Sequence, residues 1–328
     1  MLRYIARRFL FMVISLFVLS FVSYCIIELP PGDYAEMYIK RLETTGTQID
    51  ENLIINLKRQ YGYDKPFLQR YWDWIFNIVT RGNFGVSILW AKPVSYLIND
   101  RLPFTIALSV LTLGVTYALA IPIGIFSATH QYSLWDYVFI VAGFIGLAVP
   151  NFLLALVMMY FLLTKFGVSP GGLFSPEFES AAWSIPKAWD LVKHLVVPVT
   201  IIGLSGTAGL IRTMRATLLD ELGKDYLDTA RMKGVAYWRA VMKYPVRIAI
   251  NPILSTIGWL LPAIVSGSTI VAIVLNLPTV GPLLIAALIA QDMFMAGGVI
   301  FLLTALTLIG TFLSDMILAV ADPRIRFE

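Results

Sequence analysis

The chain has 328 residues, of which 58% are hydrophobic and only 14% are charged. A soluble domain carries about 25% charged and about 45–50% apolar residues, and here the apolar excess is gathered in blocks. A bilayer core of ~30 Å requires roughly 20 apolar residues of helix, which these blocks supply. The composition excludes an ordinary soluble protein and predicts an all-α polytopic membrane protein. The net charge of +4 does not indicate nucleic-acid binding, because the basic residues are distributed as in membrane-protein loops.

The first apolar block, residues 9–29, follows a basic start with Arg3, Arg7 and Arg8. This order resembles a signal peptide, but the apolar run is too long and no small-residue cleavage site follows. We therefore interpret the block as an uncleaved signal anchor and first span. Cys25 is the single cysteine, so one chain cannot form a disulfide or a cysteine-based metal site.

A long loop, residues 30–104, follows the first span. Within it, Asp64 is a plausible helix cap, with Pro66 in the first turn. Apolar side chains such as Tyr71 and Trp74 then recur at helical spacing. We expect an amphipathic helix that packs on the spans, with a docking platform for an external partner as the second interpretation.

Five further apolar blocks complete six predicted transmembrane helices: residues 105–129, 135–164, 195–211, 248–275 and 296–320. The fourth block is short and rich in glycine. The fifth contains Pro252, Gly258, Pro262 and Gly267, so we expect a kink or break near its middle.

Lysine and arginine predict the orientation of the spans. They flank the first and last spans and are dense in residues 212–247, whereas residues 276–295 contain none. Basic residues mark cytoplasmic loops, and loops longer than about 60 residues translocate largely regardless of charge. Both termini and residues 212–247 are therefore predicted to be cytoplasmic.

The sequence contains no G-x-x-x-x-G-K-[ST] run, no H-E-x-x-H and no G-x-S-x-G, so no catalytic or nucleotide site of these types is expected on this chain. His130 and His194 fall at opposite membrane faces and cannot share a metal. Asp315 is the clear exception to the near absence of charge in the spans. We expect it to cap a helix or pair with a cytoplasmic arginine, with a proton relay as the alternative.

The segment LGKDYLDTARMKGVAYWRAVMKYP, residues 222–245, is polar and basic although it lies between two apolar spans. Moving its basic residues into lipid would cost on the order of 2.5–3.5 kcal/mol each, so it stays in the cytoplasm. Leu218, Leu219, Leu222, Tyr226, Leu227 and Ala230 fall on or near one helical stripe. Gly234 permits a tight turn, and residues 237–249 form a second helical segment that leads into span five. A helix, turn and helix between two spans could receive force from a soluble motor; an ordinary positive-inside loop is the alternative.

The same segment resembles the cytoplasmic loop of ABC importer permeases of the dipeptide/oligopeptide/nickel class. DTARMKG matches the E-A-A-x-x-x-G pattern, with Asp228, Thr229 and Ala230 in the leading places and Gly234 as the glycine. The whole of GKDYLDTARMKG is similar to the family's GQDYVRTARAKG. Other family-like motifs occur in order along the chain: PPGDYA, YGYDKPFLQRYWDW, GNFGVS, RLPFT, AVPNF, HLVVPVTIIGL and DPRIR. The long first outer loop indicates the B-type member of a permease pair.

The resemblance implies a type I importer fold, with residues 1–328 as one transmembrane permease domain in a bacterial or archaeal inner membrane. The partners it implies are a second, C-type permease, two cytoplasmic ATPases and an extracytoplasmic substrate-binding protein. ATP and Mg would bind to the ATPases, and this chain would carry no cofactor. The cargo would be peptides or oligosaccharides, because residues 171–194 are a longer outer insertion than a minimal peptide permease needs.

The resemblance also assigns candidate site residues. The coupling helix that docks on an ATPase would consist of Lys224, Asp225, Tyr226, Asp228, Thr229, Ala230, Arg231, Lys233 and Gly234. The candidates for the translocation path are Asn151, Asn251, Ser266, Ser268 and Thr269; for each, helix packing is the alternative. Two other functions stay open, an ion-coupled secondary transporter without an ATPase and a membrane anchor for a cytoplasmic complex.

Overall fold

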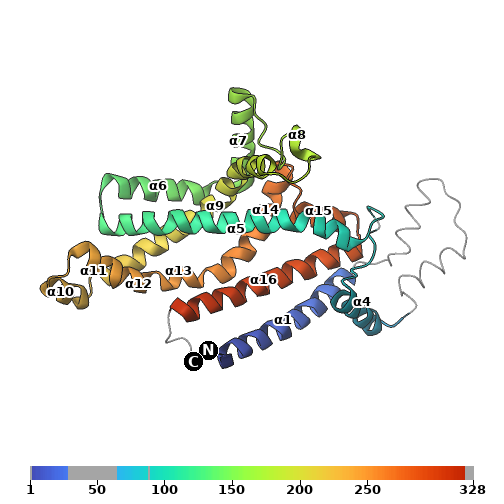
Figure 1. Ribbon diagram of the computed structural model, residues 1–328, viewed down its shortest axis with the longest axis horizontal. Coiled ribbons are helices and arrows are strands. Elements are labelled where there is room, and N and C mark those ends of the chain that lie inside the picture. The colour runs from blue at the N-terminus through green and yellow to red at the C-terminus, as the bar shows by residue number, and fades with distance from the viewer. Residues whose placement is uncertain (1, 29–64, 88, 322–328) are drawn as a thin grey trace, which may run out of the picture. The chain divides into compact units, whose positions relative to one another are not determined.

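The computed structural model describes residues 2–28, 65–87 and 89–321 (Figure 1). These residues form helices, and β-structure among them is limited to an isolated bridge between Val86 and Pro93. The all-α fold class is confirmed. The expected cap Asp64 and the motifs PPGDYA and DPRIR lie outside the described residues. The helices are α1 (Leu2–Glu28), α4 (Phe67–Arg81), α5 (Val94–Thr129), α6 (Leu134–Ala148), α7 (Asn151–Phe166), α8 (Pro176–Glu179), α9 (Ile185–Leu222), α10 (Asp225–Met232), α11 (Tyr237–Lys243), α12 (Pro245–Ala249), α13 (Asn251–Ser255), α14 (Ile257–Val274), α15 (Val280–Ile289) and α16 (Met293–Ala321).

Four of the described helices, α1, α5, α9 and α16, are long and apolar enough to cross a membrane. Two further pairs of helices are bent at a break, and the number of candidate spans is six if each pair counts as one span. The first joins α6 to α7, and the second joins Tyr237–Leu260 to Ala263–Val274 with a bend of 55°. This second bend is the break that the prolines and glycines of the fifth block predicted.

The third span differs from the single helix predicted for residues 135–164. Helix α6 ends at Ala148, and α7 starts at Asn151 with its axis turned by 102° (Figure 1). Proline disfavours helical backbone in the residue before it and lacks the N–H that would continue the hydrogen-bond ladder. Val149, before Pro150, is accordingly extended, with φ −87° and ψ 122°.

The fourth span is much longer than the predicted residues 195–211. Helix α9 has 38 residues and includes Pro198. It begins after Ser184, whose side chain accepts a hydrogen bond from the Lys187 N–H, as an N-cap residue does. The apolar block therefore marked only the central part of a helix whose ends are polar, and the last part of the 171–194 insertion belongs to α9.

The chain divides into two compact units, residues 1–9, 104–281 and 309–328 in the first and residues 10–103 and 282–308 in the second. In the first unit, α9 is central and packs against α6, α7, α12, α13 and α14. The core around it includes Ile201, Met214 and Leu218, each exposed by 1% or less. The predicted single permease domain stays a prediction.

The second unit is built around α4. Tyr71, Trp74 and Ile78 are buried on one face and cluster with Phe301, and the Tyr71 hydroxyl lies 2.8 Å from the Ser20 hydroxyl. The predicted amphipathic helix that packs on the spans is thus confirmed. Its opposite face leaves Leu68, Trp72, Phe76 and Val79 exposed, so the docking-platform interpretation stays a prediction.

Asp315 pairs with an arginine of the first helix, as one sequence interpretation expected. Arg8 Nη1 lies 3.1 Å from Asp315 Oδ2, and both residues belong to the first unit. The beginning of α1 and the end of α16 therefore lie together, which agrees with the prediction that both termini share one membrane side.

Candidate coupling and translocation site

The predicted helix–turn–helix segment is present between α9 and α14. It consists of α10, α11 and α12, and Figure 1 shows α10 and α11 beyond the end of α9. The stripe predicted from Leu218 to Ala230 is not one helix, because α9 ends at Leu222 and α10 starts at Asp225. Its members still gather in one core cluster, which is the packing that the spacing indicated. The second segment is divided at Tyr244, where Pro245 begins α12.

The turn after α10 depends on the backbone of Gly234. Its φ is +83°, a left-handed conformation that glycine adopts at little cost. The Gly234 N–H donates to Arg231 O at 2.9 Å, and the Val235 N–H donates to Ala230 O at 3.2 Å, which closes the end of α10. A Cβ on Gly234 would have no atom within 4 Å. The backbone angle, rather than space, therefore requires glycine here.

One face of α10 anchors the segment to the membrane helices. Leu227 is 4% exposed and Ala230 is 8% exposed, both in the core cluster of α9. Tyr226 is half-buried, and its hydroxyl donates to Glu221 Oε2 at 2.7 Å. Burial, together with this carboxylate, raises the pKa of Tyr226, so the phenol stays protonated and able to donate. Among the predicted coupling residues, Tyr226 and Ala230 thus face inward.

The other predicted coupling residues lie on the outer surface of the segment: Lys224, Asp225, Asp228, Thr229, Arg231, Lys233 and Gly234. Arg231 lies 3.6 Å from Asp228 and its guanidinium lies 5.4 Å from the centre of the Tyr237 ring. Met232 is 81% exposed, and Trp238 is 53% exposed. Exposed apolar side chains rimmed by charges are typical of a protein–protein contact surface.

A buried ion pair that the sequence analysis missed joins α6 to α9. Arg215 Nε and Nη2 donate to the two carboxylate oxygens of Asp136 at 2.9 and 2.8 Å. Ser127 also donates its hydroxyl to this carboxylate, and the Tyr132 N–H donates at 3.0 Å. Asp136 is fully buried and lies within the predicted third span, so Asp315 is not the sole acidic residue of the predicted spans. Ser133, three residues before Asp136, is a helix-cap signal in the sequence, but no sequence signal indicates the pairing of Asp136 with Arg215.

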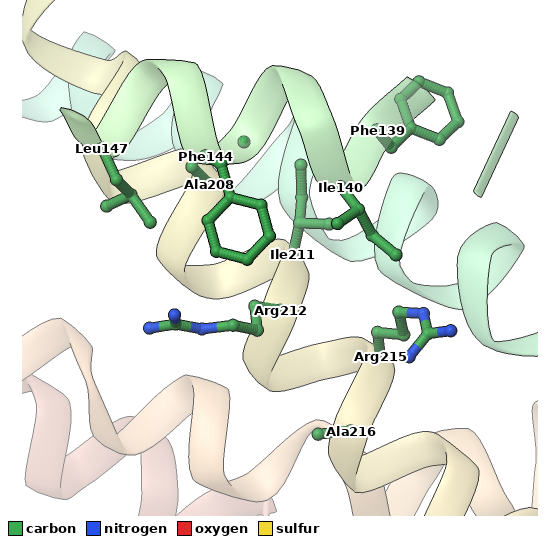
Figure 2. Close-up of a pocket in the computed structure, with 10 residues that line it drawn as sticks. Phe139, Ile140, Phe144, Leu147, Ala208, Ile211, Arg212, Arg215 and Ala216 are labelled. Atoms are coloured by element: carbon green, nitrogen blue, oxygen red, sulfur yellow. The ribbon is translucent and has the colours of Figure 1, made fainter. Parts of the chain in front are cut away.

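Two cavities lie beside α9 in the first unit. The smaller, of about 240 Å³, lies between α6 and α9, and Phe139, Phe144, Arg212 and Arg215 are among its lining residues (Figure 2). The larger cavity has a volume of about 460 Å³. Its polar lining consists of Thr116, Asn151, Ser205, Arg212, Thr213 and Thr256.

The predicted path residues are only partly brought together. Asn151 lines the larger cavity with Gly267, but Asn251, Ser266, Ser268 and Thr269 do not line it. Ser268 is 5% exposed and donates to Val265 O at 2.9 Å, which agrees with the packing alternative. The other polar lining residues were missed because hydropathy does not indicate which side of an apolar helix faces a cavity.

The protein has helices long enough to span a membrane, an exposed helical segment between two of them and a polar cavity beside them. These features are typical of membrane transport subunits. Residues 120–327 match the family described as binding-protein-dependent transport system inner membrane component, and residues 1–109 match the N-terminal part of such membrane components. The chain belongs to this family of binding-protein-dependent transport system inner membrane components.

Several relatives align over almost the whole chain. The oligopeptide transport system permease protein AppB of Bacillus subtilis is 31% identical, with 100% of both chains covered. A putative peptide permease protein of Brucella suis is 32% identical over 99% of both chains. The inner membrane ABC transporter permease protein YejB of Escherichia coli O157:H7 is 27% identical over 99% of both chains. The family resemblance seen in the motifs is confirmed.

Family membership makes this chain a multi-pass inner-membrane permease and the transport subunit of its system rather than an enzyme. A binding-protein-dependent ABC system implies a separate binding protein and ATPase subunits that bind the nucleotide.

Proposed function

We propose that this chain is a permease subunit of an ATP-driven, binding-protein-dependent importer of peptides. AppB and the Brucella suis relative carry names that refer to oligopeptides and peptides, and both align over essentially the full chain. None of the names of these relatives refers to an oligosaccharide, so oligosaccharide transport has no support. The remaining assembly would be a C-type permease, two ATPases that hold ATP and Mg, and an external binding protein.

The observation that carries the coupling role is the two-faced character of α10. Its inner face, with Leu227 and Ala230, is buried in the same core as α9, and its outer face presents Asp225, Asp228 and Arg231. A partner that grips the outer face would therefore move α10 together with the end of α9. ATP-driven closure of the ATPases would favour one arrangement of the spans over another, which is alternating access.

The cavity beside α9 supports a translocation path through the first unit. Asn151 is the predicted path residue that lines it. Asn251, Ser266, Ser268 and Thr269 stay candidates for a different conformation of the transporter. On this proposal, both termini and α10 face the cytoplasm, and residues 171–194 face the outside.

Gly234→Val tests the coupling role, as does the pair Asp225→Lys and Asp228→Lys. A β-branched side chain at φ +83° strains the turn by roughly 1–2 kcal/mol, and the lysines replace both negative charges of the docking face with positive ones. We expect each variant to reach the membrane but to lose peptide uptake and co-purification with the ATPases.

Gly82→Val is the matched control, because Gly82 has φ +60° and equally open surroundings but lies at the end of α4. It should retain the ATPases. Normal uptake by the Gly234 and aspartate variants would contradict the coupling role. Peptide uptake driven by an ion gradient, with no ATPase bound, would instead indicate a secondary transporter.

A further inference from the structure

Arg212 is a cation without a protein partner in the described part of the chain. It makes neither an ion pair nor a hydrogen bond there, although it lies on α9 only three residues before Arg215. Arg215 forms a two-point contact with Asp136, whereas the Arg212 side chain points away from Arg215 (Figure 2), although both residues line the smaller cavity. Arg215 therefore has its anionic partner within the chain, whereas the guanidinium of Arg212 can contact a ligand.

Arg212 borders both cavities beside α9, and it is the charged residue in the lining of the larger one. An isolated cation near the apolar part of a membrane is costly unless it faces water or an anion. A cavity of about 460 Å³ falls in the range of roughly 300–1,000 Å³ that holds small ligands. Arg212, whose side chain is exposed, thus combines a positive charge that has no partner among the described residues with space for an anion.

The rest of the lining provides hydrogen-bonding groups suited to a peptide. Thr116 is 1% exposed, and its hydroxyl has no hydrogen-bond partner within the described residues. Asn151 at the start of α7 and Ser205 of α9 line the same cavity. A buried hydroxyl without a partner is a cost that a bound polar ligand can remove.

We propose that Arg212 binds the C-terminal carboxylate of the cargo peptide in this cavity, and this assignment rests on the proposed function. Guanidinium groups bind carboxylates through two parallel hydrogen bonds, which gives both strength and orientation. The amide groups of the peptide would be bound by Thr116 and Asn151. The phosphate of an anionic lipid offers a similar charge, so the experiment must distinguish the two sources.

Arginine-specific modification measures the occupancy of Arg212 directly. The assembled transporter in detergent is treated with phenylglyoxal, and the modified fraction of each arginine is measured by mass spectrometry. Three additions are compared at equal concentration: tri-alanine with a free carboxylate, tri-alanine amide, and phosphatidylglycerol. Arg81 is exposed on α4 and serves as the internal reference.

Tri-alanine should slow modification of Arg212 several-fold, with no change at Arg81, whereas its amide should give little protection. Equal protection by acid and amide, or no protection by either, would overturn the proposal. Protection by phosphatidylglycerol alone would assign the site to a lipid headgroup and overturn it as well.

Uptake by Arg212→Gln separates this proposal from the proposed function. Loss of one charge-assisted contact should lower the uptake of tri-alanine about tenfold, whereas Arg212→Lys should retain part of it. The amount of ATPase that co-purifies should not change, and Arg81→Gln should behave as wild type. Failure of the wild type to take up peptides would contradict the proposed function, whereas wild-type uptake by Arg212→Gln would contradict only the arginine site.

Discussion

Asp136 and Arg215 form an ion pair in which both carboxylate oxygens of Asp136 accept hydrogen bonds. The carboxylate is fully buried and accepts hydrogen bonds from Arg215, Ser127 and the Tyr132 backbone. Removal of one partner of a fully buried pair costs roughly 3–5 kcal/mol, because the other charge is left unpaired. The cost here should be smaller, since 20% of the Arg215 side chain is exposed.

We therefore expect Arg215→Gln to lower the unfolding temperature of the purified transporter by several degrees. The double variant Asp136→Asn with Arg215→Gln should recover part of this loss, because no buried charge remains. A scanning fluorescence measurement on the four members of this cycle tests the coupling. Equal destabilisation by the single and double variants would show that the contact is not a cooperative unit.

For single residues, the sequence predicted the features whose signal lies in neighbouring positions of the chain. The need for glycine at position 234 follows from a turn between two helical patterns, and the pairing of Asp315 follows from its closeness to a basic helix end. Asp136 and Arg215 are 79 positions apart, and their contact depends on how α6 packs on α9. No local sequence signal specifies that packing.

Helix α10 is held to the membrane helices chiefly by its apolar inner face. Leu227 is 4% exposed and lies in the core cluster with Leu218 and Val246. A buried leucine shortened to alanine typically costs 2–5 kcal/mol. Because α10 has only eight residues, such a loss would weaken its attachment to α9 while its outer face keeps its charges.

Leu227→Ala should therefore keep the ATPases bound but uncouple them. We expect basal ATP hydrolysis to persist, whereas its stimulation by the cargo-loaded binding protein and peptide uptake fall several-fold. Leu68→Ala, a 59% exposed site on α4, is the matched control and should be neutral. Undiminished stimulation in Leu227→Ala would show that this anchor does not transmit the movement.

Two predicted elements differed from the observed ones for identifiable reasons. The third span was interpreted as one helix because hydropathy is continuous across residues 135–164, although Pro150 redirects the backbone. The fourth span was predicted too short because its polar ends do not contribute to an apolar block, although Ser184 caps a helix that starts well before it. Hydropathy located the apolar parts of these elements but not the helix axes.

The orientation of the whole molecule is predicted from charge alone, and it can be tested because the single cysteine, Cys25, can be replaced to give a background without thiols. In a Cys25→Ala background, Glu177→Cys on α8 and Arg239→Cys on α11 would each present one thiol. A membrane-impermeant maleimide should label position 177 in intact spheroplasts and position 239 only after permeabilisation. Labelling of position 239 from outside would reverse the predicted topology.

Helix α9 is one continuous element of 38 residues, which at a rise of 1.5 Å per residue extends for about 57 Å. That is nearly twice the ~30 Å thickness of the hydrocarbon core, so the same rod protrudes from the bilayer. A displacement near Leu222 is carried along this helix to Pro198, the proline inside it, where the missing backbone N–H permits a kink. Residues 198–222 therefore move together, so a small tilt at Leu222 also displaces the part of the helix that lies deeper in the protein.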